Sequence, residues 1–195
     1  MAGAVIVSAD LATVGTARAT SGATVFSGDR LNTDRLGSLQ VRAGAARLML
    51  MASSHAVWGA EEGKPEATLT GGTAVFSTAN AKAFVLRAGT AVFQPQNDQP
   101  TIADVTLLNP KELIVRCSRG ALTIAVEDDL RVIPGGTAYR VVLDANAAPA
   151  AAAQRDRRQE PKKAGKSKFI WYAIAFTALV TAFAVHEALE SPDRP

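Results

Sequence analysis

The chain has 195 residues, of which 48% are apolar and 6% aromatic, so it can bury one core of ordinary size. Its single cysteine, Cys117, excludes an internal disulfide framework and a four-cysteine zinc site. The net charge of +3 is unevenly placed, because residues 1–153 are neutral, 154–168 carry +5 and 169–195 carry −2. A basic folded surface is therefore not predicted, which argues against nucleic acid as a partner.

Residues 1–19 are expected to form the first strand or strands, and they lack the basic start of a cleavable signal peptide. Residues 20–145 consist of short runs that alternate or are rich in β-formers, separated by turn signals such as Gly71-Gly72. This pattern predicts an all-β domain, a sandwich or rolled sheet of about 10–13 short strands. The expected strands cover 23–27, 38–43, 46–51, 55–59, 67–72, 73–78, 82–88, 90–95, 101–108, 112–118, 121–127, 130–133 and 137–144.

A five-residue phrase occurs twice in this domain, as Gly-Thr-Ala-Val-Phe at 72–76 and again at 89–93. Glycine permits the positive φ or close approach that the start of a strand can require. Strand alternation then places Ala74 and Phe76 on one face, with Thr73, Val75 and Ser77 on the other. The alternative is chance similarity among β-rich strings.

Few residues could carry chemistry. His55 is the one histidine before the C-terminal segment, and its place in a strand-like run favours a rim position over a catalytic triad. Alternation in 112–118 puts Leu113, Val115 and Cys117 on one face, so Cys117 is interpreted as a core residue. Residues 127–129, Glu-Asp-Asp, could hold a cation but are more typical of a turn. No catalytic, metal or cofactor site is predicted.

Six strand phrases follow one another along the domain: GATVFSGDRLNT (22–33), GSLQVRAGAARLMLMASSHAVW (37–58), LTGGTAVFS (69–77), FVLRAGTAVF (84–93), LIVRCSRGALTIAV (113–126) and IPGGTAYRVVL (133–143). Their order resembles that of the FecR-like domain family, the periplasmic module of ferric-citrate-type transmembrane signalling regulators. The resemblance implies an all-β sensory or interaction domain without catalysis over residues 20–144. The regulators place a cytoplasmic anti-sigma region before their membrane span and the FecR domain after it, whereas here the predicted span follows the domain. Direct control of a sigma factor is therefore not implied.

The last part of the chain changes character. A basic linker rich in alanine and proline, 146–168, reads as a flexible stalk. A transmembrane helix is predicted for 169–187, followed by a short acidic tail, 188–195. The small residues of the predicted transmembrane helix permit a weak homodimer through the span. Four residues are expected at the membrane interface: Lys166, Lys168, Trp171 and Tyr172.

The two lines of argument give different sides of the membrane for the β domain. The positive charges before the span place it in the cytoplasm, whereas the family resemblance implies the periplasm. A signal peptide lost to a misassigned start codon would reconcile them.

Together these features predict a non-enzymatic, membrane-anchored FecR-like module that binds a protein, a peptide or an envelope polymer. The alternative is a structural scaffold of a cell-envelope assembly.

Overall fold

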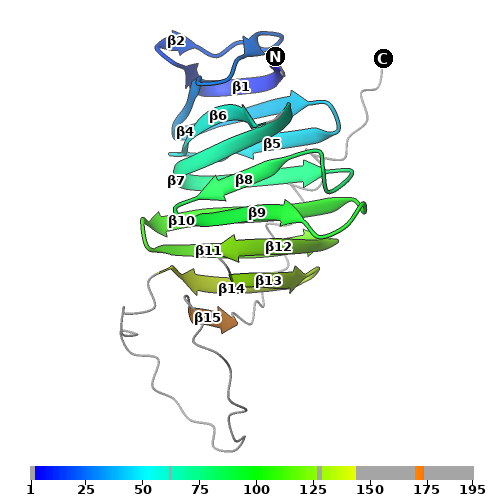
Figure 1. Ribbon diagram of the computed structural model, residues 1–195. Helices are drawn as coiled ribbons and strands as arrows, with labels where there is room; N and C mark the ends of the chain where they lie inside the picture. Colours follow the sequence, from blue (N-terminus) through cyan, green and yellow to red (C-terminus); the bar gives the residue numbers. More distant parts are fainter. Residues whose placement is uncertain (1–2, 62, 127–128, 144–169, 174–195) are drawn as a thin grey trace, which may run out of the picture.

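A computed structural model describes residues 3–61, 63–126, 129–143 and 170–173. These residues form β-strands, turns and loops and contain no helix, which confirms the all-β prediction (Figure 1). The strands are β1 (Ala4–Val14), β2 (Ala17–Arg18), β3 (Thr24–Val25), β4 (Arg30–Ala43), β5 (Ala46–Leu50), β6 (His55–Glu61), β7 (Lys64–Thr78), β8 (Val85–Ala88), β9 (Ala91–Pro95), β10 (Thr101–Asn109), β11 (Glu112–Arg119), β12 (Ala121–Val126), β13 (Asp129–Pro134), β14 (Thr137–Val142) and β15 (Ile170–Ala173).

One continuous sheet rolls over into two facing layers, because three long strands each contribute to both layers. The first part of β7 pairs with β6 and β8, and its second part pairs with β5 and β10. The strands β1 and β4 divide in the same way. Layer A comprises the start of β1, the end of β4, the end of β7, and β3, β5, β10, β11, β14 and β15. Layer B comprises the end of β1, the start of β4, the start of β7, and β2, β6, β8, β9, β12 and β13.

The continuity of β7 corrects one prediction. The sequence led us to expect two strands, 67–72 and 73–78, separated by a turn at Gly71-Gly72, but one strand runs through both. Gly72 has a φ of 80°, so it bends the strand from layer B into layer A without ending it. The fully buried Ser54 supports this corner, because its Oγ accepts a 2.8 Å hydrogen bond from the backbone N–H of Thr73.

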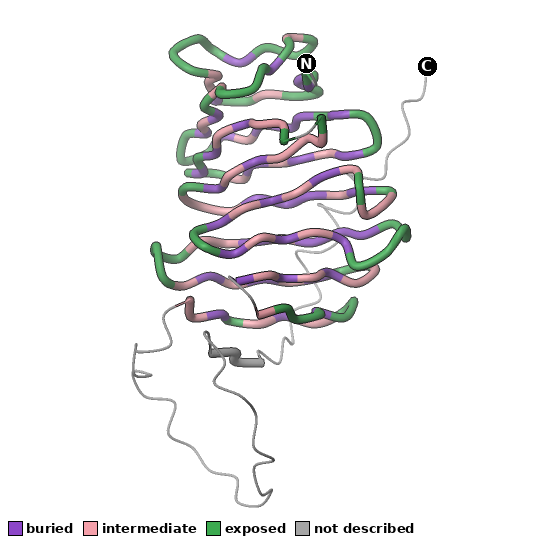
Figure 2. Tube along the Cα trace, in the orientation of Figure 1, coloured by how far each residue is buried: buried purple, intermediate pink, exposed green. Residues whose placement is uncertain are grey.

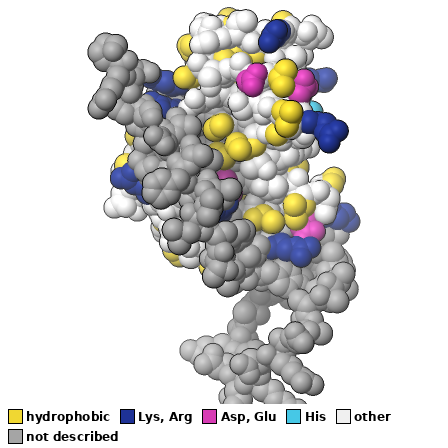
Figure 3. Space-filling view, turned by 180° about the vertical axis from the view of Figure 1, so that it is seen from behind, with side chains coloured by type: hydrophobic (Ala, Val, Ile, Leu, Met, Phe, Trp, Pro, Cys, Tyr) yellow, Lys and Arg dark blue, Asp and Glu magenta, His cyan; other side chains and the backbone are white. Residues whose placement is uncertain are grey.

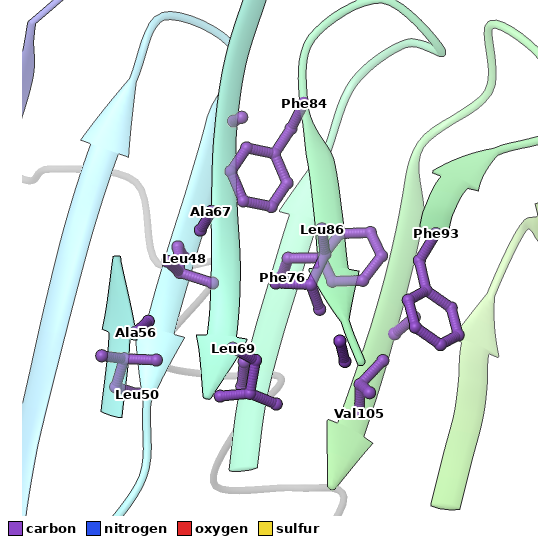
Figure 4. Packing of buried hydrophobic residues seen from close by; sticks show 14 of the residues in the cluster. Leu48, Leu50, Ala56, Ala67, Leu69, Phe76, Phe84, Leu86, Phe93 and Val105 are labelled. Atoms are coloured by element: carbon purple, nitrogen blue, oxygen red, sulfur yellow. The ribbon is translucent and has the colours of Figure 1, made fainter. Parts of the chain in front are cut away.

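The core lies between the layers and follows the expected alternation. Buried and exposed residues alternate along most strands (Figure 2). The predicted inward positions Leu113, Val115 and Cys117 are all 0% exposed. Phe84, just before β8, stacks on Trp58 of layer B at 5.9 Å between ring centroids and contacts Phe76 of layer A at 5.8 Å. These contacts join the two layers, and Figure 4 shows Phe76 and Phe84 among the buried residues of the core.

The repeated phrase now has a structural explanation. Its first copy enters layer A in β7 and its second enters layer B in β9, and both glycines have positive φ. Ala74 and Phe76 are fully buried, as are Ala91 and Phe93 in the second copy, which confirms the predicted inward face. Val75 faces outward as predicted but is only 4% exposed, because it packs in an outer cluster with Ile102, Met49 and Met51.

Most of the C-terminal predictions fall outside the described residues, including the linker 146–168, the tail 188–195 and residues 174–187 of the predicted span. Residues 170–173 form β15, an extended strand that pairs antiparallel with β14 from Ile170 opposite Val142 to Ala173 opposite Tyr139. These four residues are therefore not helical in this structure. Within the described ranges no helix has the length and apolar character needed to cross a membrane.

Candidate functional site

The residues considered for catalysis or cation binding lie in different strands where the structure describes them, His55 in β6 and Asp129 in β13. His55 is exposed at the start of β6, and its Nδ1 lies 3.0 Å from Oδ1 of Asn32. Glu127 and Asp128 lie outside the described residues, whereas Asp129 begins strand β13 and pairs with Arg131 at 3.6 Å. In the described part of the chain, no three His, Cys, Asp or Glu side chains are close enough together to hold a metal ion.

Cys117 is predicted to be unreactive in the folded protein. Burial raises the pKa of its thiol to about 11, because the charged thiolate loses solvation inside the core. Treatment of the native chain with a thiol-specific alkylating reagent at pH 8 should therefore leave Cys117 unmodified, with full labelling after denaturation. Rapid labelling of the native protein, followed by mass spectrometry, would show that the thiol is accessible and contradict the burial argument.

One recess among the described residues is a hollow on the outer face of layer B, lined by both charged and apolar side chains. Its volume is about 460 Å³. Alternation along β8 and β9 creates its floor, because Leu86 and Phe93 point into the core while Val85 and Val92 point outward. The hollow is lined by Glu61, Lys64, Glu66, Lys82, Val85, Arg87, Val92 and Gln94.

Arg87 organises the charges of this hollow. Its Nη2 donates to Glu61 at 2.7 Å, and its Nε donates to Glu66 at 3.1 Å. The hydrogen bond to Glu66 is the main reason that the pKa of Arg87 is raised. Lys64 Nζ donates to the carbonyl oxygen of Ala81 at 3.2 Å. The backbone N–H of Lys82 donates to Asn80 Oδ1 at 3.1 Å, whereas its ammonium has no hydrogen-bond or ion-pair partner among the described residues.

An apolar strip leads from this hollow to the last strand of layer B. Val92 lies opposite Ala125, and Ala125 lies opposite Leu130 of β13. Leu130 is 65% exposed and Val132, on the same face of β13, is 47% exposed. β13 pairs with β12 on one side and with no described strand on the other. In the part of the chain that the structure describes, this second edge thus presents unpaired backbone groups next to two exposed aliphatic side chains.

At the same end of the molecule, the last strands of layer A are β14 and β15. The strand β15 comes from a distant part of the sequence and pairs with the edge of β14. Of the four predicted membrane-interface residues, Lys166 and Lys168 lie outside the described residues. Trp171 and Tyr172 belong to β15, in register with Val141 and Arg140. The structure therefore places these two at a strand pairing.

The outer face of layer A also carries an ion pair between an arginine and a carboxylate. Arg116 Nε pairs with Asp104 at 3.1 Å in the middle of the face. Burial raises the pKa of Asp104 despite this cation. On the face seen in Figure 3, basic and acidic side chains are interspersed among hydrophobic ones.

The hollow was not predicted from the sequence. Its charged residues are separated by up to 26 positions, as in the pair Glu61–Arg87, and only the pairing of β7 with β8 brings them together. The one available signal was the alternation in 82–88, which puts Val85 and the charged Arg87 on the outward face. For β13, the sequence does show the aliphatic residues Leu130 and Val132. It does not show that one edge of the strand has no pairing strand among the described residues.

Comparison with known proteins gives little guidance. No family model matches the chain, and none of the curated proteins matches it. Two crystal structures of a candidate anti-sigma factor from Parabacteroides distasonis ATCC 8503 are similar to it, each with 13% identity, a TM-score of 0.49 and coverage of 58% of this chain. The match spans about half of that protein, 54% of its length. A likeness this slight carries no argument about function.

Proposed function

We propose that this chain is a non-enzymatic binding module in signalling, tethered to a membrane by residues 169–187, which recognises an extended segment of a partner protein. The observation that carries the proposal is the outer edge of β13, with which no strand of the described residues pairs. An edge strand offers unpaired N–H and C=O groups, and a partner segment can complete the ladder by adding one more strand.

Several features of layer B support this mode of binding. Backbone hydrogen bonds would supply affinity, while Leu130 and Val132 would contact alternate side chains of the added strand. The strip formed by Val92 and Ala125 extends the apolar contact across the same face. The order of strand phrases that resembles the FecR-like family agrees with a signalling role.

A photo-crosslinking amino acid at position 132 tests this proposal. In cells, the full chain labelled at Val132 is expected to crosslink one extended segment of a single partner protein, and a synthetic peptide of that segment should bind the purified chain. Val132→Lys should abolish this binding, because a lysine on an edge strand opposes further pairing. The matched control is position 36, where Leu36 is 84% exposed but lies in β4, far from β13 in the sheet order.

Two results would contradict the proposal. Equal crosslinking from positions 132 and 36 would show that the contact is nonspecific. Crosslinks from position 132 only to a second copy of the chain would favour the structural scaffold.

A further inference from the structure

We infer that the hollow around Arg87 binds a short peptide that carries a free carboxylate next to an aliphatic side chain. The inference goes beyond the proposed function, because it concerns the side-chain surface of β7, β8 and β9 and does not depend on the β13 edge. It rests on the floor of the hollow, on its charges and on its continuation into a neighbouring recess.

The floor of the hollow fits an aliphatic group. Val85 lies opposite Glu66 in the β7–β8 pairing, and Val92 lies opposite Arg87 in the β8–β9 pairing. The two valines are partly exposed and diagonal to each other on this face, so they form a small apolar surface between charged residues. At about 460 Å³, the hollow falls within the range of small-ligand sites, roughly 300–1,000 Å³.

The charges of the hollow favour a carboxylate. Both carboxylates of the lining, Glu61 and Glu66, are engaged by Arg87. Among the described residues, the lining contains three cations against these two anions, and the cations not paired with Glu61 or Glu66 are Lys64 and Lys82. Lys82 is exposed and has no ion-pair partner among the described residues, so its ammonium can donate charge-assisted hydrogen bonds to a ligand.

A second recess indicates that the ligand is longer than a single amino acid. It has a volume of about 430 Å³, and Lys64 and Lys82 line it as well as the first hollow. It continues past the β4–β5 turn at Gly44 and Ala45. A ligand whose carboxylate meets these two lysines can therefore place further groups in either recess. A peptide has this shape, whereas a lone phosphate or sulfate would leave the valine floor uncovered.

The test uses the full chain with labelled valine methyl groups, observed by NMR. The probe is a mixture of N-acetylated dipeptides and tripeptides of alanine, valine and leucine with free C-terminal carboxylates. We expect saturable shifts of the Val85 and Val92 methyl signals, which disappear when the same peptides are C-terminally amidated. Lys82→Ala should weaken binding about tenfold, the effect of losing one charge-assisted hydrogen bond.

Lys111→Ala is the matched control, because Lys111 is also exposed but lies at the β10–β11 turn, outside both recesses. This variant should bind like the unmodified chain. The inference is overturned if the amidated peptides bind equally well, if inorganic phosphate alone produces the same shifts, or if no peptide of the mixture shifts Val85 and Val92. A loss of peptide binding in Lys82→Ala with intact crosslinking from position 132 would separate this site from the β13 edge.

Discussion

Gly72→Ala is expected to lower the free energy of unfolding by about 4 kcal/mol, as measured by chemical denaturation of the full chain. Two effects add. The φ of 80° is unfavourable for any residue with a Cβ atom. In addition, a Cβ at this position would lie 2.5 Å from the carbonyl oxygen of Ser53 and 2.6 Å from Cα of Ser54, so backbone would have to move.

Gly136→Ala separates the two effects. Gly136 has a φ of 79°, nearly the same as Gly72, but a Cβ there would meet no atom within 4 Å. The free energy of unfolding of this control should therefore fall only by the cost of the positive φ, about 1–2 kcal/mol. Equal losses in the two variants would show that the corner can relax around a methyl group. In that case Ser54 and Gly72 would not determine how β7 passes between the layers.

Local sequence pattern predicts much of this fold because a strand is a local object. Period-two alternation identified the inward faces of 72–76 and 112–118, and turn residues identified most strand ends. The local pattern did not predict the positions at which a strand passes from one layer to the other. A glycine pair that usually marks a turn lies inside β7, because Ser54 and Thr73 complete the hydrogen bonds of the bend. Those partners are 19 positions apart in the sequence, beyond the reach of local pattern.

The candidate binding surfaces were harder to predict for the same reason. The hollow depends on the parallel pairing of β7 with β8, which sets Glu66 beside Arg87. The β13 edge depends on where layer B ends, a property of the whole sheet. Residues that could be catalytic or reactive, by contrast, can be recognised from their type alone. His55 and Cys117 were therefore identified from the sequence as candidates, and in the structure His55 is exposed on the rim and Cys117 is buried in the core.

The contact between Phe84, Trp58 and Phe76 locates the region where the two layers depend most on each other. Phe84 reaches this position from the loop before β8, outside any strand. Its ring contacts one aromatic side chain in each layer, and all three residues are at most 1% exposed. No other residue type of smaller volume could fill the same space without leaving a cavity.

Phe84→Ala is accordingly expected to lower the free energy of unfolding by about 4 kcal/mol, through lost burial and the remaining cavity. Phe26→Ala is the matched control, since Phe26 is 56% exposed and should lose less than about 1 kcal/mol. A double-mutant cycle with Phe76→Ala should give a coupling of about 1 kcal/mol across the layers. A small effect of Phe84→Ala, or strict additivity with Phe76→Ala, would mean that the layers are held together by their shared strands and not by this aromatic contact.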